Sequence, residues 1–191
     1  MTDFFGLPAH PLFAHIPVVL IPLCALGAVL MCWQKMRDRI GWIVVGLLVI
    51  AGIATQLTIM AGKNLKEYVK ETQLMRDHVH MGENVRPWLL LMFLCLLGVM
   101  LVDRAMKKRA TEAAEGGEGA APAAGAGGRD TLKVAMTVLL ALSIVFSAMS
   151  VYWIYKIGHS GSKAVWQPTQ TKIDKGQPEP RSESNHEGAN G

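Results

Sequence analysis

The sequence predicts an all-α protein, a four-helix transmembrane bundle. The chain of 191 residues holds four long apolar runs, and about 20 apolar residues in a helix, at a rise of ~1.5 Å each, cross the hydrocarbon core of a bilayer. Lipid offers no partner to backbone N–H and C=O groups, so the runs must be helices. With 51% apolar and 18% charged residues so distributed, a soluble enzyme is excluded, and three Cys exclude a disulfide-stapled domain.

The first two runs are each long enough to span a membrane without residues from the flanking segments. Leu12–Trp33 has His15 as its only strongly polar side chain, and Ile40–Ala61 contains Gln56 as its one amide. A signal peptide needs a basic N-terminal region and a small-residue cleavage site. Met1–His10 has no Lys or Arg, so we expect the first run to be retained as a span.

The third run, Trp88–Val102, is short. It reaches the headgroups if Arg86 extends its charged end toward them and Pro87 sits near the helix start, where a missing N–H costs nothing. The fourth run is Val134–Ile157. Small residues in the second and fourth runs are expected to mark close helix contacts, and these are Gly46, Gly52, Ser143, Ser147 and Ser150.

The segments between the runs divide the chain. Residues 1–109 hold the first three spans and an outer loop, 62–86, whose mixed apolar and charged residues favour a short amphipathic helix on the membrane surface. Residues 110–130 form an Ala/Gly linker, and residues 131–166 hold the fourth span with a Gly-His-Ser-Gly segment. Residues 167–191 have the composition of a disordered tail.

Basic residues near helix ends predict the orientation, because they are enriched on the cytoplasmic side. They gather in the loop after the first run and directly after the third: Lys35, Arg37, Arg39, Arg104, Lys107, Lys108 and Arg109. We therefore expect a multi-pass protein of the bacterial plasma membrane with both termini outside. The net charge of +4 is then membrane-flanking charge, so we expect the lipid bilayer and no nucleic acid as a partner.

Five of the six histidines are expected on the outer membrane face: His10, His15, His78, His80 and His159. Neutral imidazole is a common ligand of metals and haem, and helix bundles are natural places for such sites. His15 lies inside an apolar run, where ionisable groups usually face the bundle interior. Pro11 suits the first helical turn, which leaves His10 as a cap-like residue.

The histidines predict one site with several alternatives. The preferred axial pair of a bound haem b is His15 and His80, with His159 as the substitute for either and His10 as a further candidate. The metal alternative is copper, with His15, His80 and His78 as ligands. Interfacial histidines also bond lipid headgroups and helix ends, and a lone His can join two helices, so a protein without a cofactor fits equally well.

Three segments together resemble the bacterial membrane-protein family known as domain of unknown function 2231. They are GLPAHPLFAHIP at 6–17, HMGENVR at 80–86 and GHSGSKAVW at 158–166. The family's opening His-Pro-x-x-x-His-x-Pro signature is matched by His10, Pro11, His15 and Pro17. The resemblance covers roughly residues 6–166 apart from the linker. It implies a four-helix architecture and singles out the same histidines, and it supplies no activity.

Three functions follow from this pattern. The first is a haem- or metal-binding protein associated with redox chemistry and a redox partner. The second is a cofactor-free accessory or scaffold subunit of a membrane complex, and the third is a small transporter, for which a mid-membrane charge is lacking. No nucleophile–base pair or phosphate-binding loop is present, so we expect no independent catalytic activity.

Overall fold

The structure is a computed structural model that describes residues 3–4, 7–66, 73–115 and 126–175. It contains four helices, α1 (Ala9–Leu30), α2 (Gln34–Lys66), α3 (Gln73–Glu115) and α4 (Ala126–Asp174). Before α1, two short strands, β1 (Asp3–Phe4) and β2 (Leu7–Pro8), pair in antiparallel fashion. The all-α class is confirmed, and the two-residue strands are an addition that the sequence did not predict.

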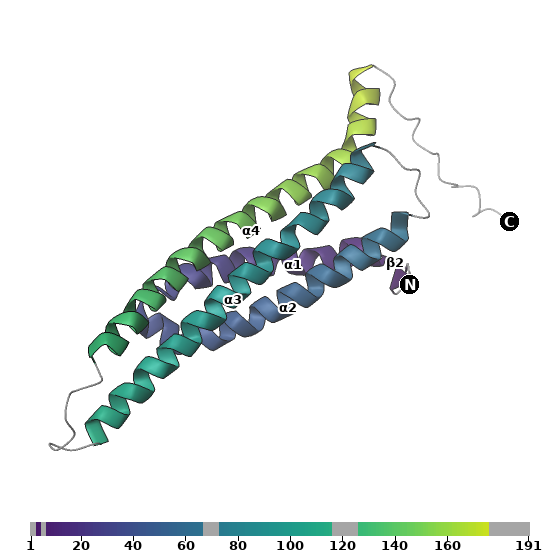
Figure 1. Ribbon diagram of the computed structural model, residues 1–191. Coiled ribbons are helices and arrows are strands. Elements are labelled where there is room, and N and C mark those ends of the chain that lie inside the picture. The colour runs from purple at the N-terminus through teal and green to yellow at the C-terminus, as the bar shows by residue number, and fades with distance from the viewer. Residues whose placement is uncertain (1–2, 5–6, 67–72, 116–125, 176–191) are drawn as a thin grey trace.

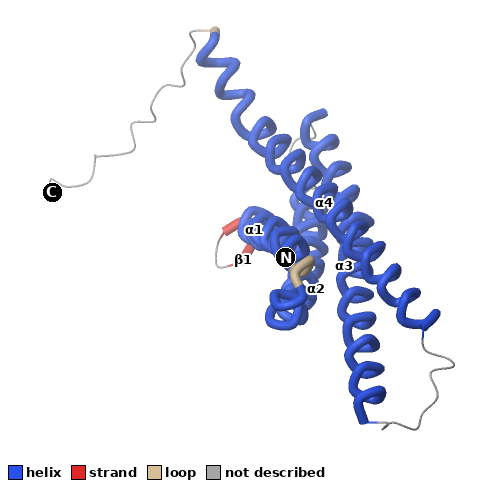
Figure 2. Tube along the Cα trace, turned by 90° about the vertical axis from the view of Figure 1, so that its left-hand side faces the viewer, coloured by secondary structure: helices blue, strands red, loops and turns tan. Residues whose placement is uncertain are grey.

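The helices form two antiparallel hairpins that cross obliquely. The first hairpin is α1 and α2, joined by the turn Met31–Trp33, and the second is α3 and α4 (Figure 1). Figure 2 views the first hairpin nearly along its axis while the second runs across it. The seams between the hairpins are the α1–α4 contact and the α2–α3 contact. We call the end with Met31–Trp33 the turn end, and α1 begins and α4 ends at the opposite end.

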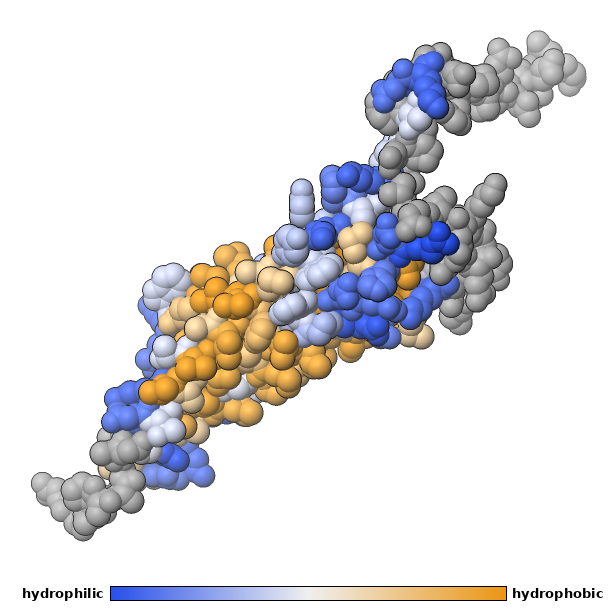
Figure 3. Space-filling model, turned by 45° about the horizontal axis from the view of Figure 1, so that its top comes forward, coloured by the Kyte–Doolittle hydropathy of each residue, from blue (hydrophilic) through white to orange (hydrophobic). Residues whose placement is uncertain are grey.

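All four helices are long and apolar enough to cross a membrane. Figure 3 shows a belt of hydrophobic side chains across the middle of the face in view, with hydrophilic side chains toward both ends. The belt includes large exposed side chains such as Val19, Ile53 and Val145. This distribution suits a lipid environment, because the hydrocarbon of the bilayer covers such surfaces without cost.

The helices extend beyond the predicted spans. Instead of forming a separate surface helix, residues 73–86 are the first turns of α3, so Pro87 lies inside a helix rather than near its start. A proline removes one backbone hydrogen bond, and neighbouring helices in a membrane protein can compensate for that loss. Residues 167–174 of the predicted tail are the last turns of α4. The rest of the tail, 176–191, and residues 116–125 of the linker lie outside the described residues.

The prediction that small residues mark close helix contacts is confirmed for the serines of α4 and wrong for the glycines of α2. Ser143, Ser147 and Ser150 are buried, as predicted. The expectation for Gly46 and Gly52 is wrong, because a Cβ at either position would meet nothing within 4 Å. The close approaches of α2 occur at Gly41, against Met100, and at Val44, whose Cγ2 would lie 2.6 Å from a Cβ on Gly27. Composition shows that a helix carries glycines but does not show which of them faces a neighbour.

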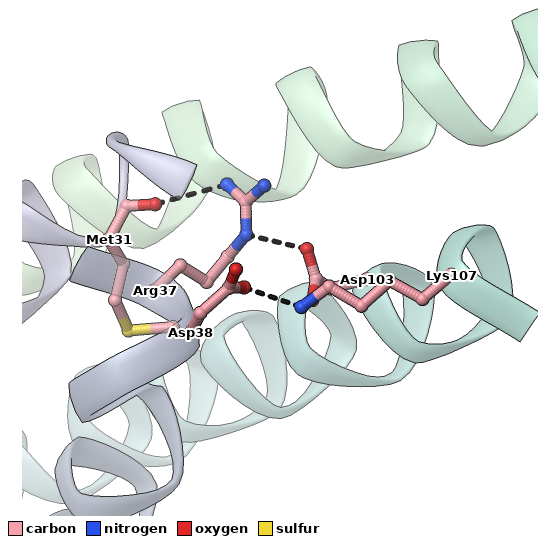
Figure 4. A network of polar contacts seen from close by, with 5 residues as sticks. All are labelled: Met31, Arg37, Asp38, Asp103 and Lys107. Carbon is pink, nitrogen blue, oxygen red and sulfur yellow. Dashed lines mark hydrogen bonds and ion pairs between the residues drawn. The ribbon is translucent and has the colours of Figure 1, made fainter. Parts of the chain in front are cut away.

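A charged network joins the two hairpins at the turn end (Figure 4). The Nε of Arg37 donates to Oδ1 of Asp103 at 2.9 Å, and its Nη1 donates to the carbonyl oxygen of Met31 at 3.1 Å. The Nζ of Lys107 lies 2.6 Å from Oδ2 of Asp103 and also pairs with Asp38. Arg37 is only 8% exposed and Asp103 only 5%. The charges at positions 37 and 107, predicted only as topological signals, therefore also hold helices together.

Removal of the buried carboxylate is expected to destabilise the fold strongly. Asp103→Ala leaves the Arg37 guanidinium buried without its counter-charge, a change that typically costs about 3–5 kcal/mol. The melting temperature in detergent should fall accordingly. The matched control is Asp130→Ala, because Asp130 forms an exposed pair with Lys133 at 3.6 Å, and such pairs contribute about 0–1 kcal/mol. Equal effects of the two changes would show that the buried pair has no special role.

Candidate functional site

The predicted site residues lie on three helices but are not gathered into one group. His15 is on α1, His78 and His80 are on α3, and His159 is on α4. All four lie toward the end opposite the turn end (Figure 1). In the part of the chain that the structure describes, no three His, Cys, Asp or Glu side chains are close enough to hold a metal ion. The side chain of His10, in the first turn of α1, lies outside the described residues.

His15 is exposed, so the expectation that it faces the bundle interior is wrong for the single chain. The buried stripe of α1 runs through Pro17, Ile21, Cys24 and Ala28, at the three- and four-residue spacing of one helix face. His15 is two residues before Pro17, which places it about 200° around the helix from the start of that stripe. An imidazole ligand at this position would meet its cofactor on the outer surface of the chain.

His78 joins α3 to α4. Its Nδ1 lies 2.9 Å from Oγ of Ser160, and that hydroxyl donates to the carbonyl oxygen of Ile157 at 2.9 Å. Because the hydroxyl proton is used in the second bond, the first requires Nδ1–H as the donor. The ring lies over Gly161, where an added Cβ would be 3.2 Å from its Cε1. Nδ1 of His78 is therefore engaged in holding α3 against α4.

His80 and His159 are exposed and have different surroundings. His80 precedes Glu83 by about one helical turn, and Glu83 pairs with Nζ of Lys63 on α2 at 2.7 Å. The ring of His159 stacks on that of Tyr155, with centroids 6.0 Å apart. Tyr155 is also exposed. These contacts place Glu83, one turn after His80, at the α2–α3 seam and His159 on the α4 surface.

The α2–α3 seam contains a groove that the sequence did not reveal. It has a volume of about 380 Å³ and is lined by Leu48, Val49, Gly52, Ile53, Thr55, Gln56, Arg86, Leu89, Leu90 and Phe93. Nη1 of Arg86 donates to Oε1 of Gln56 at 3.5 Å. The one available signal was Gln56, the single amide of its apolar run. Its partner on another helix cannot be read from the sequence.

The α1–α4 seam contains a second, wider groove of about 640 Å³. Its lining includes the small residues Ala25, Ser147 and Ala148 and, nearer the end of α4, Tyr152 and Tyr155. The Ser147 hydroxyl is buried and has no hydrogen-bond partner among the described residues. Ser143 and Ser150 differ, because their hydroxyls donate to carbonyl oxygens of their own helix.

Comparison with known proteins identifies a family. A family model described as "Predicted membrane protein (DUF2231)" matches residues 6–171. No curated protein and no solved structure matches the chain. The family match includes α1, α2, α3 and α4 up to residue 171, and the segments that carry His15, His80 and His159.

A double-mutant cycle tests the contact between His78 and Ser160. Each of His78→Ala and Ser160→Ala is expected to lower the free energy of unfolding, and the two effects should be non-additive by about 0.5–1.5 kcal/mol, the net value of one hydrogen bond. The measurement is thermal or denaturant unfolding in detergent. The cycle of His80→Ala with Ser160→Ala is the control and should be additive. Additive effects for the His78 cycle would contradict the assigned contact.

Proposed function

The chain belongs to the DUF2231 family of predicted membrane proteins, and we propose that it acts as an accessory or scaffold subunit that docks a transmembrane helix of a partner protein. The observation that carries this proposal is the α1–α4 groove with its small residues Ala25, Ser147 and Ala148. Small residues let helix backbones approach closely, and close packing is the main source of helix association in lipid. The proposed setting is a bacterial plasma membrane with both termini outside.

The use of polar side chains supports a scaffold role. Arg37 with Asp103 joins the first hairpin to α3, and Lys63 with Glu83 joins α2 to α3. His78 with Ser160 joins α3 to α4. These polar groups hold the helices in position, whereas the α1–α4 groove presents apolar and small side chains to the membrane.

Site-specific photo-crosslinking in native membranes tests the docking site. A photoreactive amino acid at position 148, in the groove, is expected to give one discrete protein adduct. The same adduct should form from position 26, on the α1 wall of the groove. Position 141 is the matched control, because Ala141 is also an exposed alanine of α4 but does not line the groove. Adducts with lipid alone from positions 148 and 26 would contradict the proposal.

A second candidate function is haem b or copper binding for redox chemistry. The observation that favours it is the common placement of His15, His80 and His159 toward one end of the helices, with all three side chains exposed. His15 and His80 remain the proposed axial pair, with His159 as the substitute. Because His15 points outward, such a cofactor would bind at the surface of the bundle rather than in its core.

An absorption spectrum of the purified chain, oxidised and reduced, tests this second function. Haem binding predicts a Soret band that is lost in His15→Ala and in His80→Ala and kept in His78→Ala, since His78 is not one of the proposed axial ligands. Copper binding predicts stoichiometric metal by elemental analysis after copper loading, and this copper should be lost in His15→Ala, His80→Ala and His78→Ala, the three predicted ligands. A spectrum without a Soret band, together with no retained copper, would exclude both cofactors.

A further inference from the structure

The α2–α3 groove has the form of a site for an amphiphilic molecule. Its length is lined by apolar side chains such as Val49, Ile53 and Leu90, which are exposed, so the groove opens toward the membrane. A Cβ at Gly52 would meet nothing within 4 Å, which shows that this glycine leaves space in the groove. The volume of about 380 Å³ is within the usual range for ligand sites. A hydrocarbon chain therefore fits along this wall.

The polar end of the groove provides hydrogen-bond donors. Gln56 lies five residues before the end of its apolar run, about 7 Å inside it, and its side chain is exposed. Its contact with Arg86 uses the amide oxygen, so the two N–H donors of the amide have no partner among the described residues. An exposed amide at this depth is costly in hydrocarbon. An acceptor such as an ester carbonyl would satisfy it.

The charges near Gln56 favour an anion. Arg86 and Lys63 carry positive charge, and Glu83 is the carboxylate paired with both, at 3.7 Å from Nη2 of Arg86 and 2.7 Å from Nζ of Lys63. Two cations against one anion leave a net positive charge at the groove end. The Arg86 side chain is 44% exposed, so its guanidinium remains accessible to a phosphate, for which its geometry is well suited.

We propose that the α2–α3 groove binds one anionic phospholipid. Its phosphodiester contacts Arg86 and Lys63, and an ester carbonyl accepts from the amide of Gln56. One acyl chain lies along Gly52 and Ile53. Guanidinium and ammonium groups form strong charge-assisted hydrogen bonds with a phosphodiester. This site is separate from the α1–α4 groove and does not depend on the partner helix or the cofactor proposed above.

The test is a lipid titration of the delipidated full-length chain in detergent, with either phosphatidylglycerol or phosphatidylcholine. Native mass spectrometry then measures the Kd of the first bound lipid. Phosphatidylglycerol is expected to bind about tenfold more tightly, as one additional charge-assisted contact implies. Gly52→Leu fills the groove and Arg86→Gln removes the cation, so each should weaken phosphatidylglycerol binding about tenfold. The melting temperature of each variant confirms that the bundle is intact.

Two matched controls accompany these variants. Gly46→Leu adds the same side chain to α2 at a position that is equally open but outside the groove. Arg104→Gln removes an exposed cation of α3 that lies over Trp42, away from the groove. Both should bind phosphatidylglycerol as the unchanged chain does. Equal affinity for the two lipids would overturn the proposal, and so would equal effects of Gly46→Leu and Gly52→Leu on phosphatidylglycerol binding. Ubiquinone that binds more tightly than phosphatidylglycerol, and whose binding is lost in Gly52→Leu, would also overturn it.

Discussion

The relative position of the two hairpins depends on one buried ion pair, Arg37 with Asp103. Helices in lipid gain little from the hydrophobic effect, so specific contacts must hold them together. A buried pair is favourable only where the remaining donors and acceptors are also satisfied. Here the Met31 carbonyl accepts from the guanidinium, and Lys107 occupies the second oxygen of the carboxylate. The pair therefore both ends α1 and fixes the turn of the first hairpin against α3.

The polar contacts at the other end of the α2–α3 seam are of a different kind. Lys63 with Glu83 is half exposed, and the contact of Arg86 with Gln56 is long at 3.5 Å. Exposed ion pairs contribute little to stability and are screened by salt. The seam is thus held firmly at the turn end and weakly at the opposite end. Weak contacts of this type can be exchanged for contacts with a ligand at small cost, which is what binding in a groove requires.

The sequence predicted the existence of each helix but not its full length or which of its faces is buried. Apolar runs identify spans because lipid excludes polar residues. The first turns of α3 lie beyond the apolar run, and they are fixed partly by the hydrogen bond between His78 and Ser160, which are far apart in the sequence. The directions of His15, Gly46 and Gly52 also depended on packing, since a helix that is apolar on all sides gives no sign of its buried face. A single histidine site stays a prediction, since His78 is bonded to Ser160 of another helix and His159 stacks on Tyr155 of its own helix.

Both grooves follow from the oblique crossing of the hairpins. Within a hairpin the helices pack closely, whereas the two seams between the hairpins, α1–α4 and α2–α3, are where the grooves lie. The two grooves share no lining residue, because a different pair of helices forms each seam. The proposed lipid site and the proposed helix-docking site can therefore be occupied independently of each other.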